Sequence, residues 1–181
     1  QAPMLQMAVA RAFQRAGRAA DAEAHFQFYL ESFTNTAGVV EAQEGRGWAL
    51  FDLGRFAESA AVFDRAALLS PDPAERARLR FKAGDACFAN GQYQLAADAY
   101  RQMIDLAAVP ALELEARSQL AEIEARQGRL QEARDQFAVL ARDFPETAIG
   151  ERAALRIAEL HQEAGALAAA RAAYDRFLSD Y

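Results

Sequence analysis

The sequence of 181 residues has little of several residue types, and each shortage excludes a class of protein. The only cysteine, Cys87, excludes an internal disulfide, and no Cys/His cluster has the spacing of a zinc site. No apolar run approaches the roughly 20 residues that a helix needs to span a bilayer, so we expect no membrane insertion by this chain. The net charge of −6 argues against nucleic acid as a partner, because phosphate neutralisation needs clustered basic side chains.

The residues that usually carry catalysis are also few or scattered. The two histidines, His25 and His161, are far apart in the sequence. We expect His25 to be exposed and His161 to be a hydrogen-bonded structural residue. Cys87 falls at a position where a small buried hydrophobic residue is expected, and the many carboxylates are spaced as on helix surfaces. We therefore expect no enzymatic activity, no metal and no cofactor.

What the chain does contain is a repeat with an unbroken register. Seven positions before each repeated glycine stands a small residue, five after it an Ala or Ser, and nine after it an aromatic residue. A fixed period in this range predicts a stack of equivalent supersecondary units. The glycines recur every 37 residues, at Gly17, Gly54, Gly91, Gly128 and Gly165.

Each repeat is predicted to be a pair of helices that turns at its glycine. In the third repeat, apolar residues recur at helical spacing over 77–90 and over 92–106. A left-handed glycine can end the first helix without a Cβ clash, and all five prolines fall at joints between repeats. We expect Gly84 and Ala96 where the two helices cross, with Tyr100 filling the space beside them.

This pattern resembles the tetratricopeptide repeat (TPR) family along the whole chain. The resemblance implies an all-α fold, a right-handed α-solenoid of five helix-turn-helix units with a 37-residue period. It also implies a non-enzymatic scaffold for protein–protein interaction. We expect a single array over residues 1–181, with repeats at about 3–36, 40–73, 77–110, 114–147 and 151–181.

The period is longer than the usual TPR period of about 34 residues. With the joint Asp143-Phe144-Pro145-Glu146-Thr147, it is similar to a bacterial cell-envelope branch of the family. That branch includes the periplasmic TPR protein that works with the Tol–Pal system and the lipoprotein that helps assemble outer-membrane barrels. The resemblance implies a periplasmic or envelope-associated location, with the cytoplasm as the alternative.

In the TPR family the first helices of successive repeats line a concave surface that binds a protein or peptide partner. Phe51 and Phe88 are one period apart, Trp48 lies three positions before Phe51, and Phe81 lies seven before Phe88. We expect these rings to form an apolar patch that anchors a partner peptide or helix; the alternative is that they are additional core. The resemblance places on this surface Trp48, Phe51, Phe81, Phe88, Met4, Met7, Arg11 and Asp85.

The fourth and fifth repeats carry charges instead of rings on the corresponding surface. Arg126, Arg152 and Arg156 stand there among glutamates and form a second, polar groove that could bind a carboxylate. The alternative is a solvated helix surface with ion pairs between successive turns. The Lys and Asn clamp of chaperone-binding TPR proteins is missing, since Lys82 is the only lysine.

The last repeat ends in an apolar segment with Tyr174, Phe177 and Leu178 and has no polar capping helix after it. This indicates a fragment of a longer repeat protein that can form a homo-oligomer through its last helix. Two other roles stay open at this point. The array can be a structural spacer or assembly module, or the sensor arm of a larger regulator or enzyme.

Overall fold

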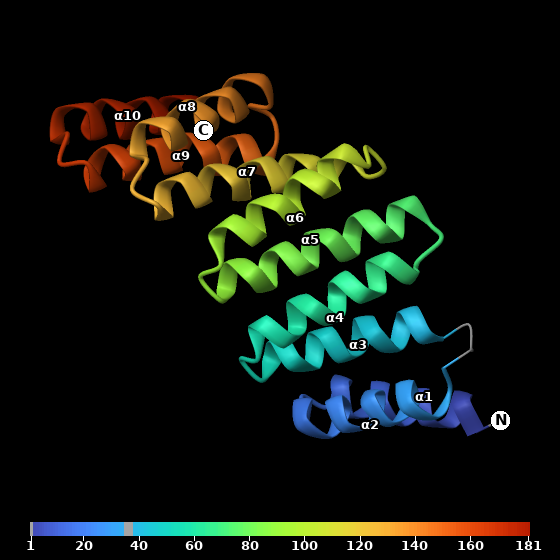
Figure 1. Ribbon diagram of the computed structural model, residues 1–181. Helices are drawn as coiled ribbons and strands as arrows, with labels where there is room; N and C mark the ends of the chain where they lie inside the picture. The colour runs from blue at the N-terminus through green and yellow to red at the C-terminus, as the bar shows by residue number, and fades with distance from the viewer. Residues whose placement is uncertain (1, 35–37) are drawn as a thin grey trace. The chain divides into compact units, whose positions relative to one another are not determined.

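The computed structural model describes residues 2–34 and 38–181, so residues 35 and 36 of the first predicted repeat lie outside the described part. Within that part the chain forms ten α-helices and no strand, which confirms the all-α class (Figure 1). The helices are α1 (Ala2–Arg15), α2 (Ala19–Ser32), α3 (Val39–Asp52), α4 (Phe56–Leu69), α5 (Pro73–Ala89), α6 (Tyr93–Asp105), α7 (Pro110–Arg126), α8 (Leu130–Asp143), α9 (Ala148–Glu163) and α10 (Leu167–Asp180).

The chain divides into two compact units. The N-terminal unit, Gln1–Val109, holds α1 to α6, and the C-terminal unit, Pro110–Tyr181, holds α7 to α10. The single array over residues 1–181 stays a prediction. None of the helices described is long and apolar enough to cross a membrane.

Every helix pair turns at its repeated glycine, as predicted. The five glycines have φ between 68° and 81°, in the left-handed region that costs an L side chain energy. The residue after each glycine donates its backbone N–H to the carbonyl five positions earlier, which closes the end of the first helix. In the third pair this bond joins Gln92 N to Cys87 O at 2.9 Å.

The small residue of the first helix and the ring of the second meet inside the second and third pairs. A Cβ added at Gly84 would lie 2.6 Å from Cε1 of the fully buried Tyr100, and one at Gly47 would lie 2.7 Å from Cε1 of Phe63. The Ser59 hydroxyl donates a 2.8 Å hydrogen bond to the carbonyl of the same Gly47. The predicted close crossing of the paired helices is therefore confirmed.

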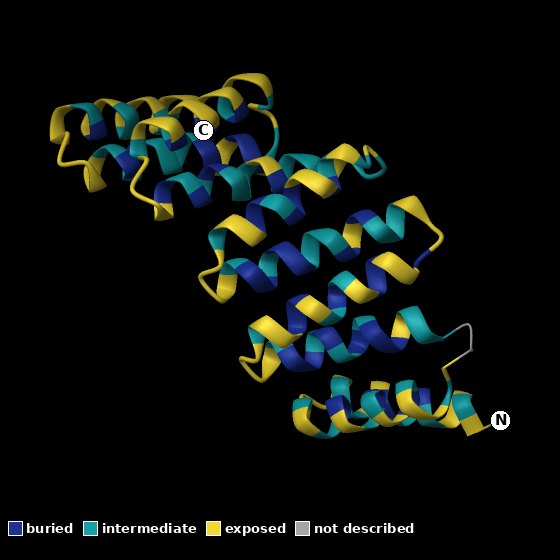
Figure 2. Ribbon diagram, viewed as in Figure 1, coloured by how far each residue is buried: buried dark blue, intermediate teal, exposed yellow. Residues whose placement is uncertain are grey.

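The core follows these crossings, and Figure 2 shows buried residues alternating with exposed ones along the helices. Phe26, Phe63, Tyr100 and Phe137 are all buried, whereas Tyr174 of the last pair is half-buried. Cys87 is buried as expected, and burial raises the pKa of its thiol.

Two of the joints between pairs, those before α5 and α9, are capped by side chains. The Asp72 carboxylate accepts hydrogen bonds from the backbone N–H groups of Ala74 and Glu75 at the start of α5. Thr147 does the same for Gly150 at the start of α9, in the Phe144-Pro145 joint. Such caps satisfy N–H groups that the helix itself leaves without a partner.

Both histidines differ from their predictions. His25 is half-buried, because its ring stacks on Phe13 at 5.0 Å and its Nδ1 lies 2.8 Å from Nε2 of Gln6. His161 is half-buried on α9, and its side chain makes no hydrogen bond with any described residue. Burial, together with the charge of Arg134, lowers the pKa of His161.

We expect Gly91→Ala to lower the free energy of unfolding by about 1 kcal/mol, because alanine at φ 72° is strained. Nothing lies within 4 Å of the added Cβ, so the loss reports the backbone alone. Urea denaturation measures it, with Asn90→Ala as the neighbouring control at an ordinary φ of −82°. Equal stability of the two variants would contradict the left-handed turn.

Candidate functional site

The aromatic residues predicted on the first helices of the second and third pairs are half-buried, and each also packs inside its own pair. The Trp48 and Phe51 rings of α3 lie 5.8 Å apart. Trp48 also lies 5.4 Å from Phe63 of α4, and Phe51 lies 5.0 Å from Phe56. One side of each ring therefore belongs to the core, and the other reaches the surface.

The two rings of α5 also pack on rings of the second helix of their own pair. Phe81 lies 5.3 Å from Tyr100, and Phe88 lies 5.5 Å from Tyr93, both on α6. No ring contact within the described residues joins the rings of α3 to those of α5. Lys82 instead places its ammonium group over Trp48, 5.3 Å from the ring centroid. The predicted apolar patch thus has a cation beside Trp48.

Ion pairs link the consecutive first helices of the N-terminal unit. Arg11 of α1 pairs with Glu41 of α3, and Lys82 of α5 pairs with Glu44 of α3. We call the surface that carries these groups the first-helix face. It comprises Arg11, Glu41, Glu44, Trp48, Phe51, Phe81, Lys82 and Phe88.

A cleft of about 170 Å³ opens on the first-helix face between α1 and α3. Trp48 and Phe26 give it apolar walls, and Arg11, Glu41 and Glu44 supply charges of both signs. Its volume suits one side chain of a ligand, not a whole small molecule, since ligand pockets usually measure about 300–1,000 Å³.

Two residues predicted for the partner-binding surface, Met7 and Asp85, make contacts within the fold instead. Met7 is 6% exposed and packs in a core cluster with Phe26 and Tyr29, so it is not available on an open surface. Asp85 accepts a 2.6 Å hydrogen bond from the Tyr100 hydroxyl, and burial together with this carboxylate raises the pKa of that phenol. Met4, by contrast, is 79% exposed near the start of α1.

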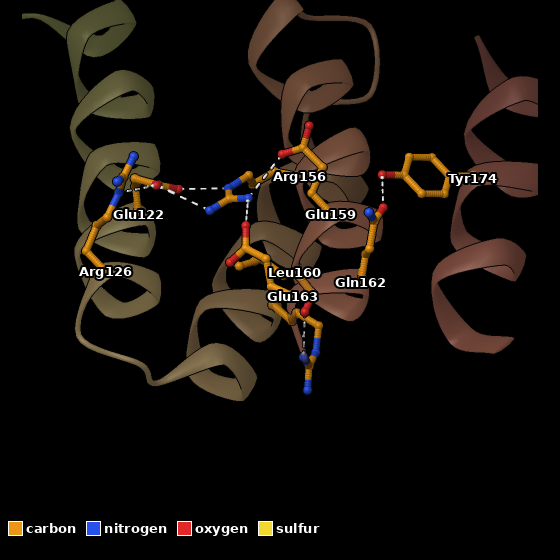
Figure 3. Close-up of polar contacts among 9 residues, drawn as sticks. Glu122, Arg126, Arg156, Glu159, Leu160, Gln162, Glu163 and Tyr174 are labelled. Atoms are coloured by element: carbon orange, nitrogen blue, oxygen red, sulfur yellow. Dashed lines mark hydrogen bonds and ion pairs between the residues drawn. The ribbon is translucent and has the colours of Figure 1, made fainter. Parts of the chain in front are cut away.

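The polar groove of the C-terminal unit is centred on Arg156 of α9 (Figure 3). Its guanidinium donates to Glu122 of α7 at 2.8 Å, to Glu159 at 3.1 Å and to Glu163 at 2.7 Å. Burial alone would lower the pKa of Arg156, but these hydrogen bonds raise it above its ordinary value. Arg126 adds a 3.0 Å hydrogen bond to Glu122.

All three arginines predicted for the polar groove already have a glutamate partner, because Arg152 also binds Glu115 at 2.9 Å. A ligand carboxylate would have to displace one of these glutamates. Hollows of about 290 and 530 Å³ lie beside Arg156, and Glu122 and Glu159 border both. The contacts favour a surface of paired charges that ties α7 to α9.

Sequence reasoning missed the ion pairs between first helices. The signal was present, because Glu115 and Arg152 are one period apart and Glu44 and Lys82 nearly so. Opposite charges at that spacing face each other on neighbouring first helices. Among the described residues, no group of three or more His, Cys, Asp or Glu side chains is arranged to hold a metal ion.

Comparison with known proteins gives a family and a fold. Tetratricopeptide repeat models match residues 8–75, 81–148 and 152–181. TPR-like repeats of a kinesin light chain from Podosopora anserina are similar at 17% identity, covering 98% of this chain and 93% of that one, with a TM-score of 0.76. No curated protein matched the sequence.

Two other similar structures are MamA and YrrB. MamA from Desulfovibrio magneticus RS-1 shares 17% identity over 98% of this chain and 93% of that one, with a TM-score of 0.74. YrrB shares 19% identity over 97% of this chain and 84% of that one, with a TM-score of 0.68. At these identities the likeness shows the fold alone.

We expect Arg156→Gln to destabilise the protein by about 1–2 kcal/mol, because it leaves three glutamates without their shared cation. The matched control is Arg152→Gln, whose 59% exposed side chain makes a weaker pair worth below about 0.5 kcal/mol. Urea denaturation at low and high salt measures both losses, and the loss at Arg156 should shrink in high salt. Equal losses for the two variants would show that Arg156 does not organise the polar groove.

Proposed function

The chain belongs to the tetratricopeptide repeat family, and on this premise we propose that it is a non-enzymatic scaffold that binds a peptide segment of a protein partner on its first-helix face. Trp48 carries the proposal. It is the only tryptophan, it is half-buried, and it forms a wall of the side-chain-sized cleft beside Arg11. Tryptophan and arginine are the residue types most enriched among binding hot spots.

The charges around the cleft indicate how a peptide is held. The side chains of Arg11 and Glu41 are 48% and 49% exposed, so their ion pair is worth little and can be exchanged for a ligand group at small cost. Lys82 and Glu44 form a second ion pair, which lies next to Trp48. An extended peptide can therefore place an apolar side chain against Trp48 and its polar groups between these four charges.

The structure of YrrB supports a peptide ligand on this kind of fold, because it is described as a TPR protein with an unusual peptide-binding site. We further propose a role in assembly or maintenance of the bacterial cell envelope, in the periplasm. The 37-residue period and the Phe144-Pro145 joint support this location, and the cytoplasm is the alternative. To distinguish the two locations, partners of this chain are selected once from a library of periplasmic proteins and once from a library of cytoplasmic proteins.

The test uses peptides selected from a phage-displayed random library on the whole chain, then synthesised and titrated by calorimetry. We expect Trp48→Ala to weaken binding by about tenfold or more, because the ring anchors the ligand. The matched control is Leu68→Ala on α4, which removes a 75% exposed side chain from the second helix of the same pair. This control should change the affinity by less than about twofold.

Trp48 also packs on Phe63, so thermal unfolding of each variant is recorded beside the affinity. The double variant Glu44→Gln/Lys82→Gln removes both charges of this ion pair and leaves the Trp48 and Phe63 rings in place. We expect it to unfold like the wild type and to bind charged peptides more weakly. A Trp48→Ala variant with a lower melting temperature and unchanged affinity would make the ring part of the core and would contradict the proposal.

A further inference from the structure

A large groove lies in the C-terminal unit, away from the polar groove around Arg156. It measures about 900 Å³, and α8 and α10 form its walls while α9, which packs against both, forms its floor. Five α9 residues line it, and three of them, Ala154, Ile157 and His161, lie on a different side of the helix from Arg152 and Arg156. We call it the alanine groove.

Small and apolar side chains line most of the alanine groove. Ala138 of α8 and Ala172 of α10 are exposed, and Ile157 and Phe177 are half-buried at its apolar floor and wall. Burial, together with the charge of Arg134, lowers the pKa of His161 and so disfavours a charge on this floor. Walls of alanine allow the backbone of another helix to come close and leave apolar surface for it to cover.

The corresponding grooves of the N-terminal unit are crossed by arginines. Arg80 of α5 reaches Asp64 of α4 at 2.5 Å, and Arg46 of α3 reaches Glu23 of α2 at 2.8 Å. Counted by the 37-residue period, Ala154 stands where Arg80 does and Ile157 where Arg46 does. The acceptor is lost as well, since Ala138 stands where Asp64 does. In the alanine groove both halves of the Arg80–Asp64 pair are therefore replaced by alanine, and the arginine of the Arg46–Glu23 pair is replaced by Ile157.

The end of the groove near the joint of α8 and α9 is acidic. Glu146, Glu151 and Asp180 border it there, and Arg176 is the one arginine of the lining that makes no ion pair with a described residue. The other arginine in the lining, Arg142, binds the neighbouring Asp143 at 2.7 Å. A ligand that fits this surface is apolar along its length and basic at one end.

We propose that the alanine groove binds an amphipathic helix of another protein, with leucine or alanine at i, i+3 or i+4 and i+7 and with Lys or Arg in the turn that lies over Glu146, Glu151 and Asp180. A helix presents such a stripe to a groove between two others, and this is a known mode of peptide recognition. Basic residues in the last turn of the ligand also suit its own dipole. The site is independent of the first-helix face.

The test uses fluorescein-labelled helical peptides of about 15 residues, long enough to follow the groove walls. One carries a leucine stripe and a last turn of arginines, a second has glutamates in that turn, and a third has the same composition with the stripe scrambled. Fluorescence anisotropy with the whole chain measures their affinities. We expect the basic-ended peptide to bind about tenfold more tightly than either of the others.

Variants locate the binding in the groove. Ala138→Asp/Ala154→Arg introduces the crossing pair found at Asp64 and Arg80, and Ala172→Arg places a charge in the wall at an exposed position. Each should weaken the basic-ended peptide by about tenfold or more. The matched control is Ala168→Arg, on an exposed α10 residue outside the lining, which should leave the affinity unchanged.

Three results would overturn the proposal: no saturable binding of the basic-ended peptide, equal binding of the glutamate-ended peptide, or unchanged affinity in Ala172→Arg. Self-association of the chain that Ala172→Arg abolishes, seen by sedimentation, would assign the groove to a second copy and would equally overturn it. Trp48→Ala should not affect this peptide, so failure here is distinguishable from failure of the first-helix face.

Discussion

The contact on which the structure depends is that of a large ring on the second helix of each pair against a small residue on the first. Tyr100 against Gly84 and Phe63 against Gly47 leave no room for a Cβ. A side chain at either glycine would force the two helices apart, and close-packed interiors do not absorb such changes without cost. Because the same contact occurs one period apart, α3 and α5 are held close to their partner helices in the same way.

Once the first helices are held in this way, equivalent positions of successive first helices within a unit reach the same surface. In the N-terminal unit these positions hold the aromatic residues Trp48, Phe51, Phe81 and Phe88. In the C-terminal unit, Glu122 stands where Trp48 does and Ala125 where Phe51 does, and Ser118 and Leu155 stand where Phe81 does. Ion pairs join consecutive first helices in both units, through Glu44 and Lys82 in one and through Glu122 and Arg156 in the other. The scaffold is thus repeated while its surface chemistry is not, which suits a binding protein with more than one kind of surface.

The alanine groove is a second case in which equivalent positions of the repeat carry different residues in the two units. In the N-terminal unit, Arg80 and Asp64 bridge two neighbouring helices. The C-terminal unit has Ala154 and Ala138 at the equivalent positions. Removing both partners of an ion pair leaves no unpaired buried charge, so the fold tolerates the replacement. What remains is exposed apolar surface beside acidic side chains, which is a feature of interaction sites on soluble proteins.

The sequence by itself determined the repeated helix pairs, their turns and their core rings, because these depend on residues a few positions apart. Gly91 turns with positive φ and Tyr100 packs on Gly84 as the spacing predicts. Only the tertiary structure decided that Met7 and His25 are covered by neighbouring side chains, that Lys82 lies over Trp48, and that the alanine groove is open. Exposure and charge pairing depend on which side chains other helices bring close, and no local pattern in one helix contains that information.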